Sequence, residues 1–171
     1  MNLGWMLPDE VMSWIFVNIP KGSTILEFGS GQGSVKLSMH YDLISVEHNE
    51  EWIGLSSGEY IHAEIIENPI SKRFGQKGWY DPKKLLDLPS FVDVIIIDGP
   101  PGDVGRIGIL DHIELLPAFK YCIVDDTDRE EESLLLGKLM SVVDSRDQIE
   151  IISSNRRSNG ELRKSTVLVR G

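Results

Sequence analysis

The sequence predicts an α/β protein with a doubly wound, mostly parallel sheet of about seven strands, helices on both faces and an antiparallel last strand. Short apolar runs alternate with helical stretches along most of the 171 residues, which is typical of a parallel sheet covered by helices. The last two apolar runs, 149–152 and 165–169, are joined by a loop that contains Asn159 and Gly160. That loop is too short for a helical crossover, so the last strand must run antiparallel to its neighbour.

The first half of the chain begins with apolar residues at helical spacing over 8–18, where Pro8 suits a first turn. Asn49 is expected as the N-cap of a short helix over 50–55. A longer stretch, 66–90, lacks periodicity and predicts an irregular insertion. The remaining expected elements are strands over 24–28, 43–47 and 60–63 and a helix over 34–39.

The second half contains an almost purely β-branched run over 92–97, which indicates a strand buried on both faces of the sheet. Asp128 and Glu131, three residues apart, are expected as a capping pair that heads the last helix. A helix over 104–116 and a strand over 120–124 are expected between these two features. The whole chain, 1–171, is therefore expected to form a single domain, with 1–20 as an N-terminal helical segment.

Composition and charge exclude several classes of protein. Hydrophobic residues make up 41% and charged residues 26% of the chain, as in an ordinary globular protein. No apolar run reaches the roughly 18 residues of a membrane span, and no signal peptide is recognisable, so a cytoplasmic protein without a membrane partner is expected. The net charge of −10 disfavours nucleic acid as a partner. The sequence carries no signal for an oligomeric state.

Two smaller features have ordinary structural interpretations. Cys122 lies in an apolar run and is expected as a buried structural thiol. Arg156 and Arg157 form a small basic patch, which is interpreted as a solvated loop tip.

A glycine-rich turn follows the first expected strand. This strand ends near Glu27 and enters Gly29-x-Gly31-x-Gly33, which presents free backbone N–H groups at a helix N-terminus. Dinucleotide enzymes carry a third glycine one position later, where this chain has Ser34. A tight turn without a ligand is the structural alternative.

Glu47 ends the next expected strand, 20 residues after Glu27. A carboxylate at this place can accept hydrogen bonds from both ribose hydroxyls of an adenosine ligand. His48 follows it directly and is also a candidate for contact with the adenosine.

These residues resemble the class I S-adenosylmethionine-dependent methyltransferases, whose first motif is similar to Glu27-Phe28-Gly29-Ser30-Gly31-Gln32-Gly33. The closing hairpin separates that family from nicotinamide-binding Rossmann domains. The resemblance implies a Rossmann-like fold and S-adenosyl-L-methionine as cofactor. It also implies a set of cofactor-binding residues, namely Glu27, Gly29, Ser30, Gly31, Gly33, Glu47, His48, Glu64 and Asp98.

Three carboxylates follow the fourth and fifth expected strands. Asp98 opens the segment Asp-Gly-Pro-Pro-Gly, and Asp125 and Asp126 follow the next strand. They should converge at the carboxyl edge of the sheet and repel one another unless a cation or a proton intervenes. Oxygen ligands of this kind suit Mg²⁺ or another divalent cation, and the arrangement is similar to that of metal-dependent O-methyltransferases.

The chain departs from the catechol-type pattern, because Pro100 and Pro101 stand where those enzymes carry a lysine base. The alternative to a metal is that Asp98 bonds loop amides or the methionine amino group. Asp126 or Asp128 would then cap the next helix.

Arg106 and Arg129 belong to segments that resemble little-characterised bacterial and plant methyltransferase-like proteins, the glucuronoxylan type among them. By that resemblance the two arginines grip an anionic substrate group; alternatively, they pair with nearby aspartates. Trp79 and Tyr80 either line the substrate pocket or anchor a loop onto the core. The other three histidines, His40, His62 and His112, have no partner recognisable from sequence.

Together these features predict an S-adenosylmethionine-dependent methyltransferase that methylates an oxygen of a small-molecule or sugar-like acceptor. Asp98, Asp126 and Arg106 are the expected catalytic residues, and Asp98, Asp125 and Asp126 the expected ligands of an assisting metal. The alternatives are a non-catalytic S-adenosylmethionine-binding protein and a nicotinamide-dependent oxidoreductase.

Overall fold

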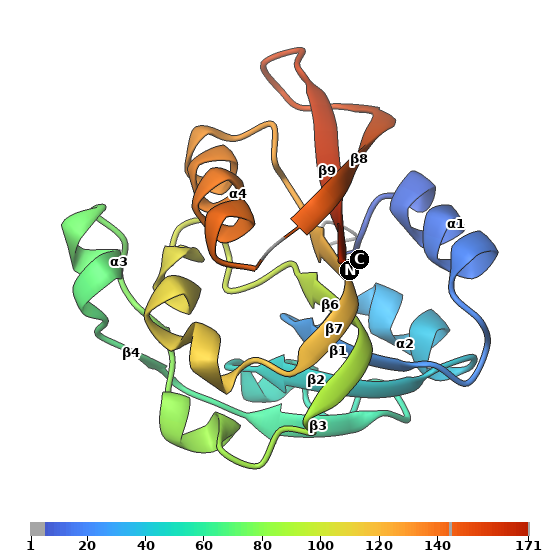
Figure 1. Ribbon diagram of the computed structural model, residues 1–171, viewed down its shortest axis with the longest axis horizontal. Coiled ribbons are helices and arrows are strands. Elements are labelled where there is room, and N and C mark those ends of the chain that lie inside the picture. Colours follow the sequence, from blue (N-terminus) through green and yellow to red (C-terminus); the bar gives the residue numbers. More distant parts are fainter. Residues whose placement is uncertain (1–5, 144, 171) are drawn as a thin grey trace.

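The structure, a computed structural model, describes residues 6–143 and 145–170. A seven-stranded sheet with the order β3-β2-β1-β6-β7-β9-β8 runs through its centre (Figure 1). The strands are β1 (Thr24–Phe28), β2 (Asp42–Glu47), β3 (Glu59–His62), β6 (Phe91–Ile97), β7 (Ala118–Val124), β8 (Ser145–Arg156) and β9 (Leu162–Arg170). The strands from β3 to β7 pair in parallel, whereas β9 runs antiparallel between β7 and β8. The predicted fold class is therefore confirmed, including the antiparallel last strand.

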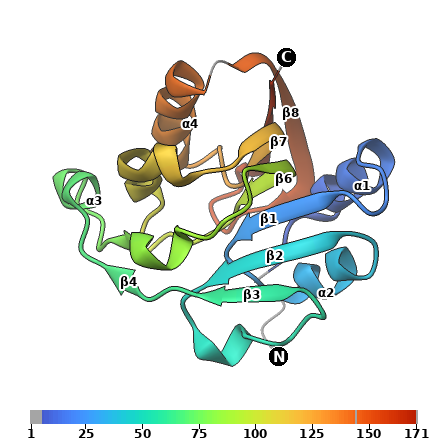
Figure 2. The ribbon, with the colours of Figure 1, turned by 60° about the horizontal axis from the view of Figure 1, so that its bottom comes forward.

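Helices cover both faces of this sheet, as Figures 1 and 2 show. One face packs against α1 (Asp9–Asn18) and α2 (Gln32–Ser38), and the other against α4 (Glu130–Val142) and the 3₁₀ segment η3 (Ile107–Leu115). Side chains of β6 alternate between the two cores, so that Ile96 faces the α1 side and Ile95 the α4 side. Burial on both faces explains why this strand is almost purely β-branched.

The order of strands creates a switch point at β1. Its neighbours β2 and β6 lie on opposite sides, and in such sheets the chain leaves the two strands in opposite directions and opens a crevice at their carboxyl ends. Gly29 N–H donates to the carbonyl of Val46 at 2.9 Å, and Asp98 N–H donates to the carbonyl of Phe28 at 3.0 Å. These bonds hold the ends of three strands together at one edge.

The stretch 66–90, expected to be irregular, contains short regular elements instead. Strands β4 (Ile65–Ile66) and β5 (Trp79–Tyr80) form an antiparallel pair, and between them lies α3 (Pro69–Arg73). The segment η2 (Pro82–Leu85) follows. Elements of two to five residues are too short to produce a hydrophobic period, so the pattern of the sequence did not reveal them.

The helix expected over 104–116 is present as the shorter 3₁₀ segment η3, which has a break at His112, whose φ is −133° and ψ 28°. The His112 ring stacks on Trp79 at 5.6 Å between ring centroids, and its Nε2 lies 3.4 Å from Nδ2 of Asn68. These contacts join residues more than 30 positions apart, which local periodicity does not encode. His62 also has a partner, since its Nε2 lies 3.1 Å from the carbonyl oxygen of His48.

The expected capping pair of α4 is not formed. The helix begins at Glu130 with Arg129 as N-cap and no side-chain cap. The Asp128 carboxylate instead accepts a hydrogen bond from the Lys164 backbone N–H at 2.9 Å and pairs with Arg157. By contrast, Asn49 does cap the short segment η1 (Glu50–Trp52), where its side chain accepts from Glu51 N–H at 3.1 Å.

Two predictions from composition can be compared with the structure. Cys122 is buried in the core, as expected, and burial raises the pKa of its thiol to about 12. Among the described residues, none of the helices has the length and apolar character needed to cross a bilayer.

Candidate functional site

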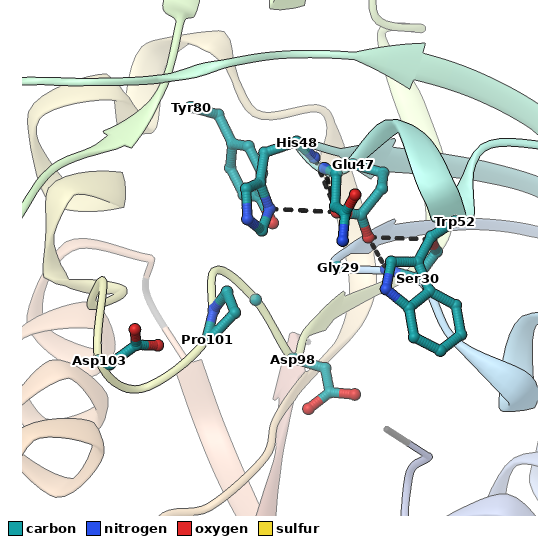
Figure 3. A pocket seen from close by; sticks show the side chains of 11 residues that line it. Gly29, Ser30, Glu47, His48, Trp52, Tyr80, Asp98, Pro101 and Asp103 are labelled. Atoms are coloured by element: carbon teal, nitrogen blue, oxygen red, sulfur yellow. Dashed lines mark hydrogen bonds and ion pairs between the residues drawn. The ribbon is translucent and has the colours of Figure 1, made fainter. Parts of the chain in front are cut away.

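A cavity of about 250 Å³ lies at the carboxyl edge of the sheet, where β1, β2 and β6 end (Figure 3). Figure 3 shows Glu47 and His48 on one side of this cavity and Asp98 on the other. We call it the donor cavity. Its lining comes from the glycine turn, the end of β2, β5 and the loop after β6, and consists of Gly29, Ser30, Glu47, His48, Asn49, Trp52, Tyr80, Asp98, Gly99, Pro101 and Asp103.

The glycine turn touches the loop after β6. Gly29 has a φ of +89°, and a Cβ atom there would lie 2.8 Å from the Cα of Gly99. Gly99 is equally confined, because an added Cβ would lie 2.6 Å from the hydroxyl of Tyr80. Side chains at either position would separate the two segments or fill the cavity between them.

Beneath the turn, Glu27 is linked to the turn through Ser34. The Ser34 hydroxyl donates to the Glu27 carboxylate at 2.5 Å and accepts from Gly31 N–H at 3.0 Å, and Ser45 donates to the same carboxylate oxygen at 2.6 Å. Burial raises the pKa of Glu27 to about 7 despite these two donors. Ser34 therefore has a structural use at the position where dinucleotide enzymes carry a glycine.

The Glu47 carboxylate is almost fully enclosed by donors. One oxygen accepts from the backbone N–H and the hydroxyl of Ser30, both at 2.9 Å. The other accepts from the N–H groups of His48 and Asn49, both at 2.8 Å. An ionised carboxylate offers about four acceptor positions, so all of them are in use in this structure. The Ser30 hydroxyl is the one donor of the four that can rotate away.

Aromatic side chains form much of the remaining wall. Tyr80 lines the cavity and is fully buried, and its hydroxyl has no hydrogen-bond partner among the described residues. His48 faces Tyr80 at 6.4 Å between ring centroids. Trp52 of η1 also lines the cavity. Trp52 could not be predicted as a lining residue, because it lies in a three-residue 3₁₀ segment without any motif.

Trp79 and Tyr80 have different roles, and each of the two interpretations from the sequence applies to one of them. Trp79 anchors its loop in the core, next to Phe28 and His112, whereas Tyr80 both packs on Phe28 and lines the donor cavity.

The predicted cofactor-binding residues fall into three groups. Gly29, Ser30, Glu47, His48 and Asp98 line the donor cavity. Glu27, Gly31 and Gly33 line a small hollow next to it, which Asp98 also borders. Glu64 is exposed and absent from the lining of both spaces, and its carbonyl oxygen accepts from Asp81 N–H at 2.8 Å as the chain turns toward η2.

The three carboxylates Asp98, Asp125 and Asp126 converge as predicted, with one oxygen of each within 4.8 Å of the others. Four arginines surround them. The two oxygens of Asp126 pair with all four, at distances from 2.6 to 3.3 Å, namely Arg106, Arg129, Arg157 and Arg163. Burial alone would raise the pKa of Asp126, but the arginines outweigh burial and hold that pKa below its ordinary value.

Asp125 and Asp98 complete this cluster. One oxygen of Asp125 accepts from the Ser165 hydroxyl at 2.6 Å and the other pairs with Arg163 at 3.0 Å. Burial and the neighbouring Asp125 carboxylate raise the pKa of Asp98 well above its ordinary value. Asp126 also adopts a φ of +60°, which is uncommon for a residue other than glycine.

This donor set does not fit a resident divalent cation. A cation at Asp98, Asp125 and Asp126 would have to displace guanidinium groups from oxygens that are already paired, and would lie among four positive charges. The mutual repulsion that suggested a metal is instead offset by arginines and by the raised pKa of Asp98.

Arg106 pairs with a nearby aspartate, which is the second of the two roles expected for it. It is 4% exposed and donates to the carbonyl oxygens of Pro100, Asp98 and Asp125 as well as to the Asp126 carboxylate. It therefore ties the loop after β6 to the loop after β7.

The interpretation of Arg156 and Arg157 as a solvated loop tip is wrong for Arg157. Arg156 is exposed, but Arg157 reaches back to Asp126 and Asp128. The sequence could not show this pairing, because these partners lie 31 and 29 positions away.

A second cavity, of about 280 Å³, adjoins the donor cavity, and we call it the arginine cavity. The two share Asp98 and Pro101 in their linings. The lining of the arginine cavity consists of Met6, Asp98, Pro101, Gly102, Arg106, Asp126, Arg129, Arg157 and Arg163.

The fold is similar to that of several solved methyltransferases. A scan against protein-family models finds no match, and neither does a search of curated proteins. Among solved structures, the magnesium protoporphyrin IX methyltransferase of Synechocystis PCC 6803 with bound S-adenosylmethionine superposes with a TM-score of 0.60 at 15% identity, over 95% of this chain and 77% of that one.

Two O-methyltransferases are also similar. The enzyme from Bacillus cereus in complex with S-adenosylhomocysteine has a TM-score of 0.58 at 12% identity, over 98% of this chain and 84% of that one. The enzyme from Streptomyces achromogenes involved in tomaymycin synthesis, in complex with S-adenosylmethionine, has a TM-score of 0.52 at 13% identity, over 95% of this chain and 79% of that one. At these identities the likeness shows the fold, a Rossmann-like fold that these S-adenosylmethionine-dependent methyltransferases share.

Proposed function

We propose that the protein is an S-adenosylmethionine-dependent methyltransferase that methylates an oxygen of a small-molecule or sugar-like acceptor. The observation that carries this proposal is the donor cavity, where the glycine turn and the Glu47 carboxylate face one space at the switch point of the sheet. The solved methyltransferases of the same fold support it.

In this proposal the donor's ribose lies against Glu47. Both oxygens of Glu47 are held by backbone N–H groups, which fix the carboxylate in place. A ribose hydroxyl would take the acceptor position that the Ser30 hydroxyl holds in this structure. Tyr80 forms part of the wall of the same cavity.

Methyl transfer would then take place between the two cavities. The acceptor oxygen attacks the methyl carbon as the carbon–sulfur bond breaks, and the sulfonium becomes a neutral thioether. The proton of an acceptor hydroxyl must go to a base, and Asp98 borders both cavities. Its raised pKa means that Asp98 holds a proton more readily than an ordinary aspartate, so it acts as the base only in those molecules in which it is ionised. Asp126 and Arg106 hold the wall on the acceptor side.

The donor half of this proposal is tested by titrating S-adenosylhomocysteine into the protein in a calorimeter. We expect binding, and we expect Glu47→Gln to weaken it roughly 10- to 100-fold, because a hydrogen bond to a charged group contributes about 1.5–3 kcal/mol. Glu51→Gln, an exposed neighbour, is the control and should bind as the wild type does. Absence of binding at millimolar ligand would overturn the proposal, and binding of NADH instead would favour an oxidoreductase.

Removal of the Ser30 hydroxyl tests the placement of the ribose. In Ser30→Ala the Glu47 oxygen loses its one rotatable donor and keeps the backbone N–H, so S-adenosylhomocysteine should bind as tightly as in the wild type or about two- to fivefold more tightly. Binding ten times weaker would show that the hydroxyl contacts the ligand directly and does not compete with it.

A further inference from the structure

The arginine cavity differs from the donor cavity in charge. Four guanidinium groups line it against two carboxylates, Asp98 and Asp126. The other carboxylates that pair with these arginines, Asp125, Asp128 and Glu132, are absent from its described lining. They hold the arginines by ion pairs, so that the lining carries four guanidinium groups and two carboxylates in a protein whose net charge is −10.

Three of the arginines come from separate segments and retain donors for a ligand. Arg129, next to α4, is 37% exposed and is held by Asp126 at 3.2 Å. Arg157, after β8, is held by Asp128 and Asp126. Arg163, in β9, pairs through one terminal nitrogen, while its buried Nε has no partner among the described residues.

Arg129, Arg157 and Arg163 all belong to the lining of this one cavity. Guanidinium groups that carboxylates already hold in place lose little further side-chain entropy on binding, and their planar donor pairs match an oxyanion in two places at once.

We propose that the methyl acceptor carries an oxyanion, a carboxylate or a phosphate, which Arg129, Arg157 and Arg163 bind in the arginine cavity. This inference rests on the proposed function for the identity of the acceptor, since the arginine cavity meets the donor cavity at Asp98 and Pro101. The oxyanion would fix the acceptor so that its hydroxyl lies toward Asp98. Arg106 is committed to backbone carbonyls and shapes the floor of the cavity.

The test is a calorimetric titration with malonate and, separately, inorganic phosphate, at low ionic strength, with and without saturating S-adenosylhomocysteine. We expect one of the two anions to bind with a Kd of about 1 mM or tighter, and the anion that binds distinguishes a carboxylate from a phosphate acceptor. Arg129→Gln should weaken this binding at least about tenfold. Arg156→Gln, the exposed neighbour of Arg157, should bind as the wild type does.

Arg129→Lys is a second variant for the case in which Arg129→Gln does not fold. It keeps the positive charge but loses the planar donor pair, so it should bind the anion with intermediate strength. Failure of the folded wild type to bind either anion at about 10 mM, or equal binding by the wild type and a folded Arg129→Gln, would overturn the oxyanion site. Failure to bind S-adenosylhomocysteine would overturn the proposed function alone, since the titration without it still decides whether the arginines bind an oxyanion.

Discussion

Two carboxylates, Glu47 and Asp126, organise the site from opposite sides. Glu47 accepts hydrogen bonds mainly from backbone N–H groups, which the turns on either side of it fix in place. Asp126 accepts from four arginine side chains that belong to different segments. The donor cavity is therefore shaped by the backbone, whereas the arginine cavity depends on long side chains. Substitutions at the arginine cavity should alter acceptor binding without disturbing the donor cavity.

Glu27 should make the stability of the protein depend on pH. Its pKa is about 7 in the folded state and 4.5 ordinarily, so the folded state holds the proton more tightly than the unfolded one. Its contribution to the free energy of unfolding is therefore greatest below about pH 4.5 and falls by roughly 3 kcal/mol as pH rises to 7 and beyond. Glu27→Gln removes this dependence while keeping an acceptor for Ser34 and Ser45.

Urea denaturation of both proteins between pH 5 and pH 8 measures this effect. Relative to the wild type, the free energy of unfolding of the variant should rise by up to roughly 3 kcal/mol as the pH increases across that range. A difference in unfolding free energy that stays constant with pH would show that Glu27 does not titrate there.

At the scale of secondary structure, success in predicting an element depended on its length and on local signals. The strand over 24–28 matches β1, and the run 92–97 lies within β6, because burial on both faces leaves a pattern that one segment carries alone. The break at His112 depends on Trp79 and Asn68. Such contacts arise only when the chain has folded, and the sequence of η3 gives no sign of them.

The same distinction applies to the candidate site. Glycine turns and the acidic ends of strands are local, so Gly29, Glu47 and Asp98 could be predicted from the sequence, and all line the donor cavity. Arg157 and Arg163 reach Asp126 from β8 and β9. Their role depends on the register in which the last two strands pair, which shifts between Ser145 and Asp147 and between Ile152 and Arg156, and the hydrophobic pattern of the sequence does not reveal such shifts.

Gly29 in the glycine turn and Gly137 in α4 should respond oppositely to substitution by alanine. Gly29→Ala introduces a Cβ at a φ of +89° and 2.8 Å from the Gly99 backbone, so it should lower the free energy of unfolding by about 1–3 kcal/mol. Gly137 lies on the exposed side of α4, with nothing within 4 Å of an added Cβ. Gly137→Ala should raise the free energy of unfolding by about 0.5–1 kcal/mol. Denaturant unfolding measures both, and a stabilising Gly29→Ala would contradict the close contact between the turn and the loop after β6.

At the scale of the whole molecule, charge is unevenly distributed. The chain has 17 lysines and arginines against 27 acidic residues, yet four arginines meet in one cavity. The overall negative field repels anions at long range, so only a ligand that the arginines contact directly would be held there. Selectivity for an anionic acceptor would therefore come from local contacts within the cavity, and electrostatic steering would not assist its entry.

The donor should stabilise the whole protein, because the lining of its cavity joins the ends of β1, β2, β5 and β6. At a concentration about 100 times its Kd, S-adenosylhomocysteine contributes about 2.7 kcal/mol to the folded state. For a chain of 171 residues this corresponds to a rise in Tm of roughly 5–10 °C. Scanning calorimetry measures the rise, and Glu47→Gln at the same ligand concentration should show less than about half of it. An equal rise in that variant would mean that the ligand binds away from Glu47, and therefore outside the donor cavity.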